Sequence, residues 1–88
     1  ELNCLRNWSL KMLNDQEKKE FWQLLKRIGN NLRKVRKERK KSQEEMSEIL
    51  GISYRHYQKL EHGDRPLSMR SLFRISRRSK IPIKELMQ

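Results

Sequence analysis

The sequence is poor in the residues on which disulfide frameworks and sharp chain reversals depend. Its 88 residues include one cysteine, two prolines and three glycines. The single cysteine, Cys4, excludes an intrachain disulfide, and we interpret it as a small apolar residue of the first segment. No apolar run reaches the roughly 18–20 residues of a membrane span, and none near Glu1 has the pattern of a signal peptide. These absences favour a protein of the reducing cytoplasm.

Alternation of apolar and polar residues is also missing, which argues against β-strands. The glycines and prolines lie between periodic segments or at their ends, with Gly29 as the exception. Elsewhere the apolar residues recur at the three- and four-residue steps of a helix. The sequence therefore predicts an all-α fold, and its length suits one domain.

Acidic residues are scarce as well. Eleven Asp and Glu oppose 22 Lys and Arg, which leaves a formal net charge of +11. Residues 26–42 carry nine basic residues and one acid, and residues 70–84 carry six basic residues and no acid. A solvated basic surface is the simpler interpretation, but self-repulsion of this size destabilises a small domain unless a polyanion relieves it. The charge therefore favours a nucleic-acid partner.

A capping box at Asn14 and Glu17 predicts the start of the first helix. The apolar stripe that follows consists of Phe21, Trp22, Leu24, Leu25, Ile28, Leu32 and Val35. Gly29 lies within it and either splits the helix or is tolerated in a continuous one at about 1 kcal/mol. A continuous stripe would suit a two-helix dimer seam, whereas a split would fold the extra helix back onto its own domain.

Serine residues that can cap a helix, and glycines that can end one, predict where the two shorter helices begin and end. Ser42 and Glu45 form a second capping box, and Gly51 ends that helix in the left-handed conformation that glycine adopts without strain. Ser53 caps the next helix, and Gly63 ends it.

The last two helices follow the loop after Gly63. Ser68 caps the first of them, and Pro82 stands at the first turn of a short helix from Ile83 to Met87. We expect the inward residues after Ser68 to be Met69, Leu72, Phe73 and Ile75.

Two short helices joined by a glycine turn form a helix-turn-helix when the second helix is presented to the major groove of DNA. Ser47 is small enough for the helices to approach closely, and Ile52 fills the angle between them. Tyr57 and Leu60 fix the second helix from inside. Its other face carries donors, acceptors and cations, which suit base edges and phosphates better than a protein surface. That face consists of Ser53, Tyr54, Arg55, Gln58 and Lys59.

From Ser42 to Gly63, with Arg36 before and Arg65 after, the sequence resembles the phage-repressor and Cro-like helix-turn-helix domain. The resemblance extends over residues 28–87 and rests on IGNNLRKVR, SQEEMSEIL, GIS and LEHG in that order. It implies a five-helix domain of the lambda-repressor type at residues 28–88. Residues 1–27 would then form an N-terminal arm or helical extension, available to a dimer or to a protein partner.

The resemblance also implies roles for individual residues. Arg36 and Glu61 would form a buried ion pair that joins the first helix to the reading helix. The residues at base-reading positions would be Ser53, Tyr54, Arg55, Gln58 and Lys59. Phosphates would be contacted by Ser42, Gln43 and Arg65, and we add Lys37 from the basic run. Members of the family generally bind near-palindromic sites as dimers.

Two departures from the family pattern carry structural expectations. Lys40 and Lys41 replace the glycine and apolar residue that are common before the Ser-Gln pair, so we expect a different first turn. Ser79 and Lys80 stand where leucine and glycine are common, so we expect loose packing at the end of that helix.

These features predict a sequence-specific transcriptional regulator, a repressor, that binds double-stranded DNA as a dimer in the cytoplasm, of prokaryotic or phage type. The alternative is a protein–protein module, such as an antitoxin that also binds its own promoter. Nonspecific nucleic-acid binding is a third interpretation, although few aromatics lie among the basic residues. An enzyme is disfavoured, because no catalytic constellation is present. We expect no cofactor, no small-molecule substrate and no metal, since neither histidine has a second ligand at metal-binding spacing.

Overall fold

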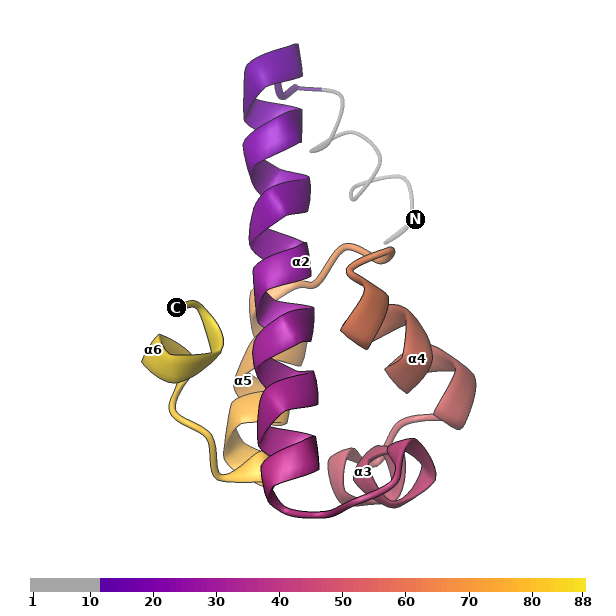
Figure 1. Cartoon of the computed structure of the whole chain (residues 1–88). Helices are drawn as coiled ribbons and strands as arrows, with labels where there is room; N and C mark the ends of the chain where they lie inside the picture. The colour runs from indigo at the N-terminus through magenta and orange to yellow at the C-terminus, as the bar shows by residue number, and fades with distance from the viewer. Residues whose placement is uncertain (1–11) are drawn as a thin grey trace.

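The computed structural model describes residues 12–88, which form five helices and no strand (Figure 1). Leu2, Cys4 and Trp8 of the predicted arm lie outside the described residues. The all-α prediction is confirmed. The helices are α2 (Asp15–Glu38), α3 (Gln43–Leu50), α4 (Tyr54–His62), α5 (Met69–Ser79) and α6 (Ile83–Leu86).

The helices begin at the predicted caps because side-chain oxygens there accept from otherwise unpaired backbone N–H groups. Asn14 and Ser42 each form a complete capping box, with Glu17 and Glu45 respectively. Ser53 and Ser68 cap α4 and α5 through the side-chain oxygen alone, which accepts from the backbone N–H of His56 and of Ser71. Pro82 directly precedes the one-turn helix α6.

Helix α2 runs without a break through Gly29, so a split helix is wrong. Its 24 residues span about 36 Å, and its first turns extend beyond the other helices (Figure 1). Gly29 is buried where α2 passes α4. A Cβ at this position would lie 2.5 Å from the carbonyl oxygen of Glu61 and closer still to that of Leu60. The glycine is therefore the contact point that sets the separation of α2 from α4.

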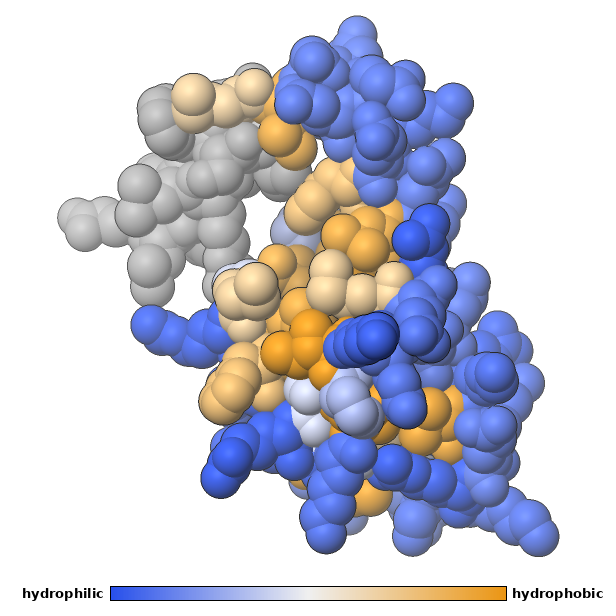
Figure 2. Space-filling model, turned by 90° about the vertical axis from the view of Figure 1, so that its left-hand side faces the viewer, coloured by the Kyte–Doolittle hydropathy of each residue, from blue (hydrophilic) through white to orange (hydrophobic). Residues whose placement is uncertain are grey.

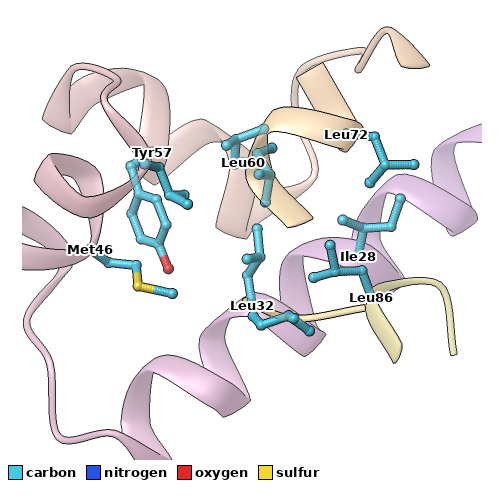
Figure 3. Close-up of a cluster of buried hydrophobic side chains, with 10 residues drawn as sticks. Ile28, Leu32, Met46, Tyr57, Leu60, Leu72 and Leu86 are labelled. Carbon is cyan, nitrogen blue, oxygen red and sulfur yellow. The ribbon is translucent and has the colours of Figure 1, made fainter. Parts of the chain in front are cut away.

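All five helices contribute to one apolar core. Ile28 and Leu32 of α2 face Tyr57 and Leu60 of α4 (Figure 3). The remaining buried members come from α3, α5, α6 and the segment before α6: Met46, Leu50, Leu72, Ile75, Ile81 and Leu86. Helix α2 therefore supplies the surface against which α4 is held.

The predicted inward face of α5 is wrong at two positions. Met69 is 74 % exposed and Phe73 is 56 % exposed, whereas Leu72 and Ile75 are buried. In α3, the helical spacing also places Ile49 on the apolar face with Met46 and Leu50, but Ile49 is 40 % exposed. These residues lie at the edges of their helices' apolar faces, and the neighbouring helices cover only the middle of each face. Figure 2 shows apolar side chains gathered in the middle of the face that carries α6.

The end of α5 also differs from the expected loose packing. Ser79 is 1 % exposed, and its hydroxyl donates to the carbonyl of Ile75 at 2.5 Å. Arg39, the residue directly after α2, donates to the Ser79 carbonyl at 2.6 Å. Lys80 ends the helix in the left-handed conformation, with φ at 60°. Hydrogen bonds thus hold this end in place without a large apolar residue.

Candidate nucleic-acid interface

The turn between α3 and α4 has the geometry of a helix-turn-helix. Gly51 adopts φ 69°, a left-handed value that glycine reaches without the steric penalty of a Cβ. The backbone N–H of Ile52 donates to the Ser47 carbonyl at 3.0 Å. Arg78 of α5 donates to the Leu50 carbonyl at 2.8 Å, beside Gly51. The turn is thus fixed both by its own backbone and by a side chain from α5.

The inner face of α4 is fully buried. Tyr57 is 0 % exposed, and Leu60 and Glu61 are also buried. Burial raises the pKa of Tyr57, so its phenol remains protonated in ordinary buffers. Within residues 12–88, the Tyr57 hydroxyl forms no hydrogen bond of ordinary geometry, although the Arg36–Glu61 pair lies beside it. The ring therefore holds α4 by packing, and directed bonds come from the next buried residue, Glu61.

Glu61 joins α4 to both α2 and α3. Arg36 Nε donates to its Oε2 at 2.6 Å, and Gln43 Nε2 donates to its Oε1 at 3.0 Å. Arg36 also donates through Nη1 to the Lys41 carbonyl at 3.0 Å. Arg36 and Glu61, which the family resemblance pairs, are therefore in contact, and the same arginine holds the Lys40–Lys41 turn.

The charges of this pair stabilise each other. Burial alone would raise the pKa of Glu61, but the hydrogen bonds from Arg36 and Gln43 outweigh it and lower the pKa below its ordinary value of 4.5. The hydrogen bond to Glu61 raises the pKa of Arg36. Both groups consequently stay ionised at neutral pH, and the orientation of α4 depends on their charges.

The outer face of α4 presents polar side chains to solvent. Ser53, Tyr54, Arg55 and Lys59 are exposed, Tyr54 by 43 %, and Gln58 is half-buried. The Ser53 oxygen accepts from the His56 N–H at 3.1 Å, which leaves its own proton free to donate. All five predicted base-reading residues thus lie on one helix or at its cap, away from the buried Tyr57.

The predicted phosphate contacts occupy two regions. Ser42 and Gln43 start α3, and Lys37 is exposed in the last turn of α2. One N–H of the Gln43 side-chain amide donates to Glu61, which leaves its second N–H and the backbone N–H at the start of α3 for an anion. Arg65 is exposed in the loop between α4 and α5. The structure places Arg65 on a different segment from the other three.

A polar cleft that sequence reasoning missed opens where α2, α3 and α4 meet. It has a volume of about 170 Å³ and is lined by Arg33, Arg36, Gln43, Glu61 and His62. Arg33 lies one helical turn before Lys37, so the two cations share a face of α2. Within the basic run, the i, i+4 spacing of Arg33 and Lys37 could have predicted that Arg33 lies beside the candidate phosphate contact Lys37. His62 Nδ1 lies 2.8 Å from the Gln58 carbonyl of its own helix.

These features define a helix-turn-helix protein whose second helix presents a polar face. A family model described as helix-turn-helix matches residues 32–86, which is more than half of the chain. The chain belongs to this Cro- and repressor-type helix-turn-helix family. A search of curated proteins found no match to an individual protein.

Family membership makes the chain a DNA-binding transcription regulator that acts on double-stranded DNA. The family is regulatory and not typically enzymatic. Within residues 12–88, no three His, Cys, Asp or Glu residues are grouped so that they could hold a metal ion. None of the described helices is both long and apolar enough to cross a membrane.

Proposed function

We propose that the protein is a sequence-specific repressor that binds near-palindromic DNA as a homodimer, with α4 in the major groove, in the cytoplasm of a prokaryotic or phage-infected cell. The observation that carries this proposal is the contrast between the two faces of α4. The inner face is fixed against the other helices through the buried residues Tyr57 and Glu61, while the outer face is polar and exposed. A rigidly held polar face is what base reading requires.

In the proposed complex, some residues position the protein on the DNA backbone and others read the bases. Ser42, Gln43, Lys37 and Arg65 contact phosphates and set the register, with Arg33 added from the cleft. Arg55 and Lys59 suit the acceptors of guanine, Gln58 suits adenine, and the Tyr54 ring suits a thymine methyl group. Neutralising about 6–8 phosphates per dimer would give a steep salt dependence, with a slope near −0.9 per phosphate.

Arg55→Ala should weaken binding to the preferred duplex about 5- to 150-fold, equivalent to about 1–3 kcal/mol, and relax the preference at one base position. The reason is that a bidentate contact from arginine discriminates guanine from the other bases. The measurement is equilibrium binding at fixed salt to duplexes selected from a randomised pool, followed by binding to each single-base variant.

Lys37→Ala is the matched control, because it also removes one exposed cation. It should weaken preferred and random duplexes by the same factor and reduce the salt slope by about 1. If Arg55→Ala behaved in the same way, α4 would contribute only charge and the assignment of Arg55 as a base reader would be wrong.

The dimer surface is proposed to lie on the first half of α2, within the 1–27 extension. Phe21 and Trp22 pack edge to face there, with ring centroids 5.7 Å apart, and both remain half-buried. This half of α2 precedes residues 32–86 of the family match. A second candidate function, an antitoxin-like module that binds a protein partner here, rests on the same aromatic pair.

The mass of the saturated DNA complex separates the two possibilities. A homodimer predicts two chains per duplex by light scattering, and Trp22→Ser should reduce this to one chain with weaker binding. One chain per duplex in the unchanged protein would contradict the homodimer and leave the aromatic pair for another protein.

A further inference from the structure

An open groove lies between α5 and α6, on the side of the molecule away from α4. It has a volume of about 470 Å³ and is lined by Phe73, Ser76, Arg77, Lys80, Ile81, Pro82 and Ile83. Figure 1 shows α6 and α4 on opposite sides of α2 and α5. The proposed DNA-binding face therefore leaves this groove accessible.

The groove combines an apolar floor with a cationic rim. Phe73 is 56 % exposed, and Ile83 is half-buried. Figure 2 shows the apolar area surrounded by hydrophilic side chains. Arg77 and Lys80 supply the positive charge, and the lining contains no carboxylate. Among residues 12–88, the only salt bridge joins Arg36 to Glu61, so neither rim cation has an acidic partner.

Lys80 has a backbone conformation that is unfavourable for any residue with a Cβ. Its φ of 60° is a conformation that glycine adopts freely and that a Cβ penalises. A cation at this position therefore costs free energy of folding that glycine would not. Lys40, which lies outside the groove, has a similar backbone conformation, so this conformation places the Lys80 cation on the rim and does not by itself mark a binding site.

The chemistry of the groove selects among possible occupants. A phosphate backbone would pair with Arg77 and Lys80 but would leave the ring of Phe73 unused. A second copy of the chain would have to bring carboxylates to Arg77 and Lys80, although it carries only 11 Asp and Glu against 22 Lys and Arg. An amphipathic segment with apolar side chains between carboxylates complements both parts of the groove.

We propose that the α5–α6 groove binds an acidic amphipathic segment of a partner protein. Its apolar side chains would contact Phe73 and Ile83, and its carboxylates would pair with Arg77 and Lys80. Because the groove lies away from α4, the segment could bind while the protein is on DNA. The proposal does not depend on the proposed repressor function, since it concerns a different surface.

The test uses a displayed library of random 12-residue peptides, selected on the full chain with and without a bound duplex. Enriched peptides should contain two or more acidic residues beside large apolar ones, in both conditions. Lys80→Gly should weaken the enriched peptide at least tenfold while raising the thermal midpoint of the protein, because it removes both the rim charge and the backbone strain. Phe73→Ser should also weaken it, and replacing the peptide's acids by their amides should abolish binding.

Lys40→Gly is the matched control. Lys40 also has a left-handed backbone, with φ at 56°, but it lies in the turn between α2 and α3. This variant should gain stability and bind the peptide as the unchanged protein does. If Lys40→Gly weakened peptide binding as much as Lys80→Gly does, the loss would reflect net charge alone, and the groove would not be the binding site. Enrichment of peptides without acids, displacement of the peptide by random duplex, or assembly of the chain through Phe73 would each overturn the proposed occupant.

Discussion

Glu61→Ala should destabilise the fold by about 3 kcal/mol, the lower end of the cost of removing one partner of a buried ion pair. The substitution leaves Arg36 without its carboxylate and Gln43 without its acceptor. It also disconnects α4 from α2 and α3 at the same point. Because Arg36 retains 12 % side-chain exposure and can be partly rehydrated, we expect the lower end of the range. Urea unfolding followed by circular dichroism measures the loss.

The same pair makes stability depend on pH in a defined direction. The pKa of Glu61 is lower in the folded chain than its ordinary value of 4.5, so its contribution is present above pH 4.5 and is lost as the pH falls through the folded value. The stability difference between the unchanged protein and Glu61→Gln should therefore shrink below pH 4.5. Glu20→Gln, at an exposed site on α2, is the control and should show little difference at any pH. A Glu61→Gln difference that stays constant into acid would contradict the ionic contribution.

Gly29→Ala should destabilise the protein by about 3 kcal/mol, at the upper end of the cost of overpacking. The new Cβ would lie 2.5 Å from the Glu61 carbonyl oxygen and 2.8 Å from its carbonyl carbon. These are backbone atoms of a helix, so α4 as a whole must move away from α2. The gain in helix propensity, about 1 kcal/mol, offsets only part of this cost.

Asn30→Ala is the control for Gly29→Ala, because it changes the next residue of α2 at an exposed site. It should leave stability unchanged or raise it by a few tenths of a kcal/mol. DNA binding should fall in Gly29→Ala even at temperatures where the chain remains folded, since the displacement moves the outer face of α4. A Gly29→Ala protein as stable as Asn30→Ala would show that the two helices do not need this close approach.

The local features of the fold could be predicted from the sequence because they depend on few residues. Asn14 and Ser42 mark helix starts through hydrogen bonds within four residues, and Gly51 marks a stop through its own φ value. The buried face of α4 was predictable from the spacing of Tyr57 and Leu60. Such features require no knowledge of the neighbouring helices.

Features that depend on how helices meet were not predictable in the same way. Periodicity places Phe73 on the apolar side of α5, but the width of the covering helices decides that it is exposed. Ser79 is buried at the end of α5, where its carbonyl accepts a hydrogen bond from Arg39, 40 positions away in the chain. Arg33 joins the candidate site only because α2 passes the start of α3 beside α4.

The central claim is that the outer face of α4 reads double-stranded DNA by sequence. Its most direct test is selection of duplexes from a randomised pool by the full chain at fixed salt, followed by the ratio of dissociation constants for random and selected duplex. We predict a selected duplex that binds at least about 10³-fold more tightly than random DNA. A ratio near one, with no enriched sequence, would contradict the claim and leave only charge-driven binding.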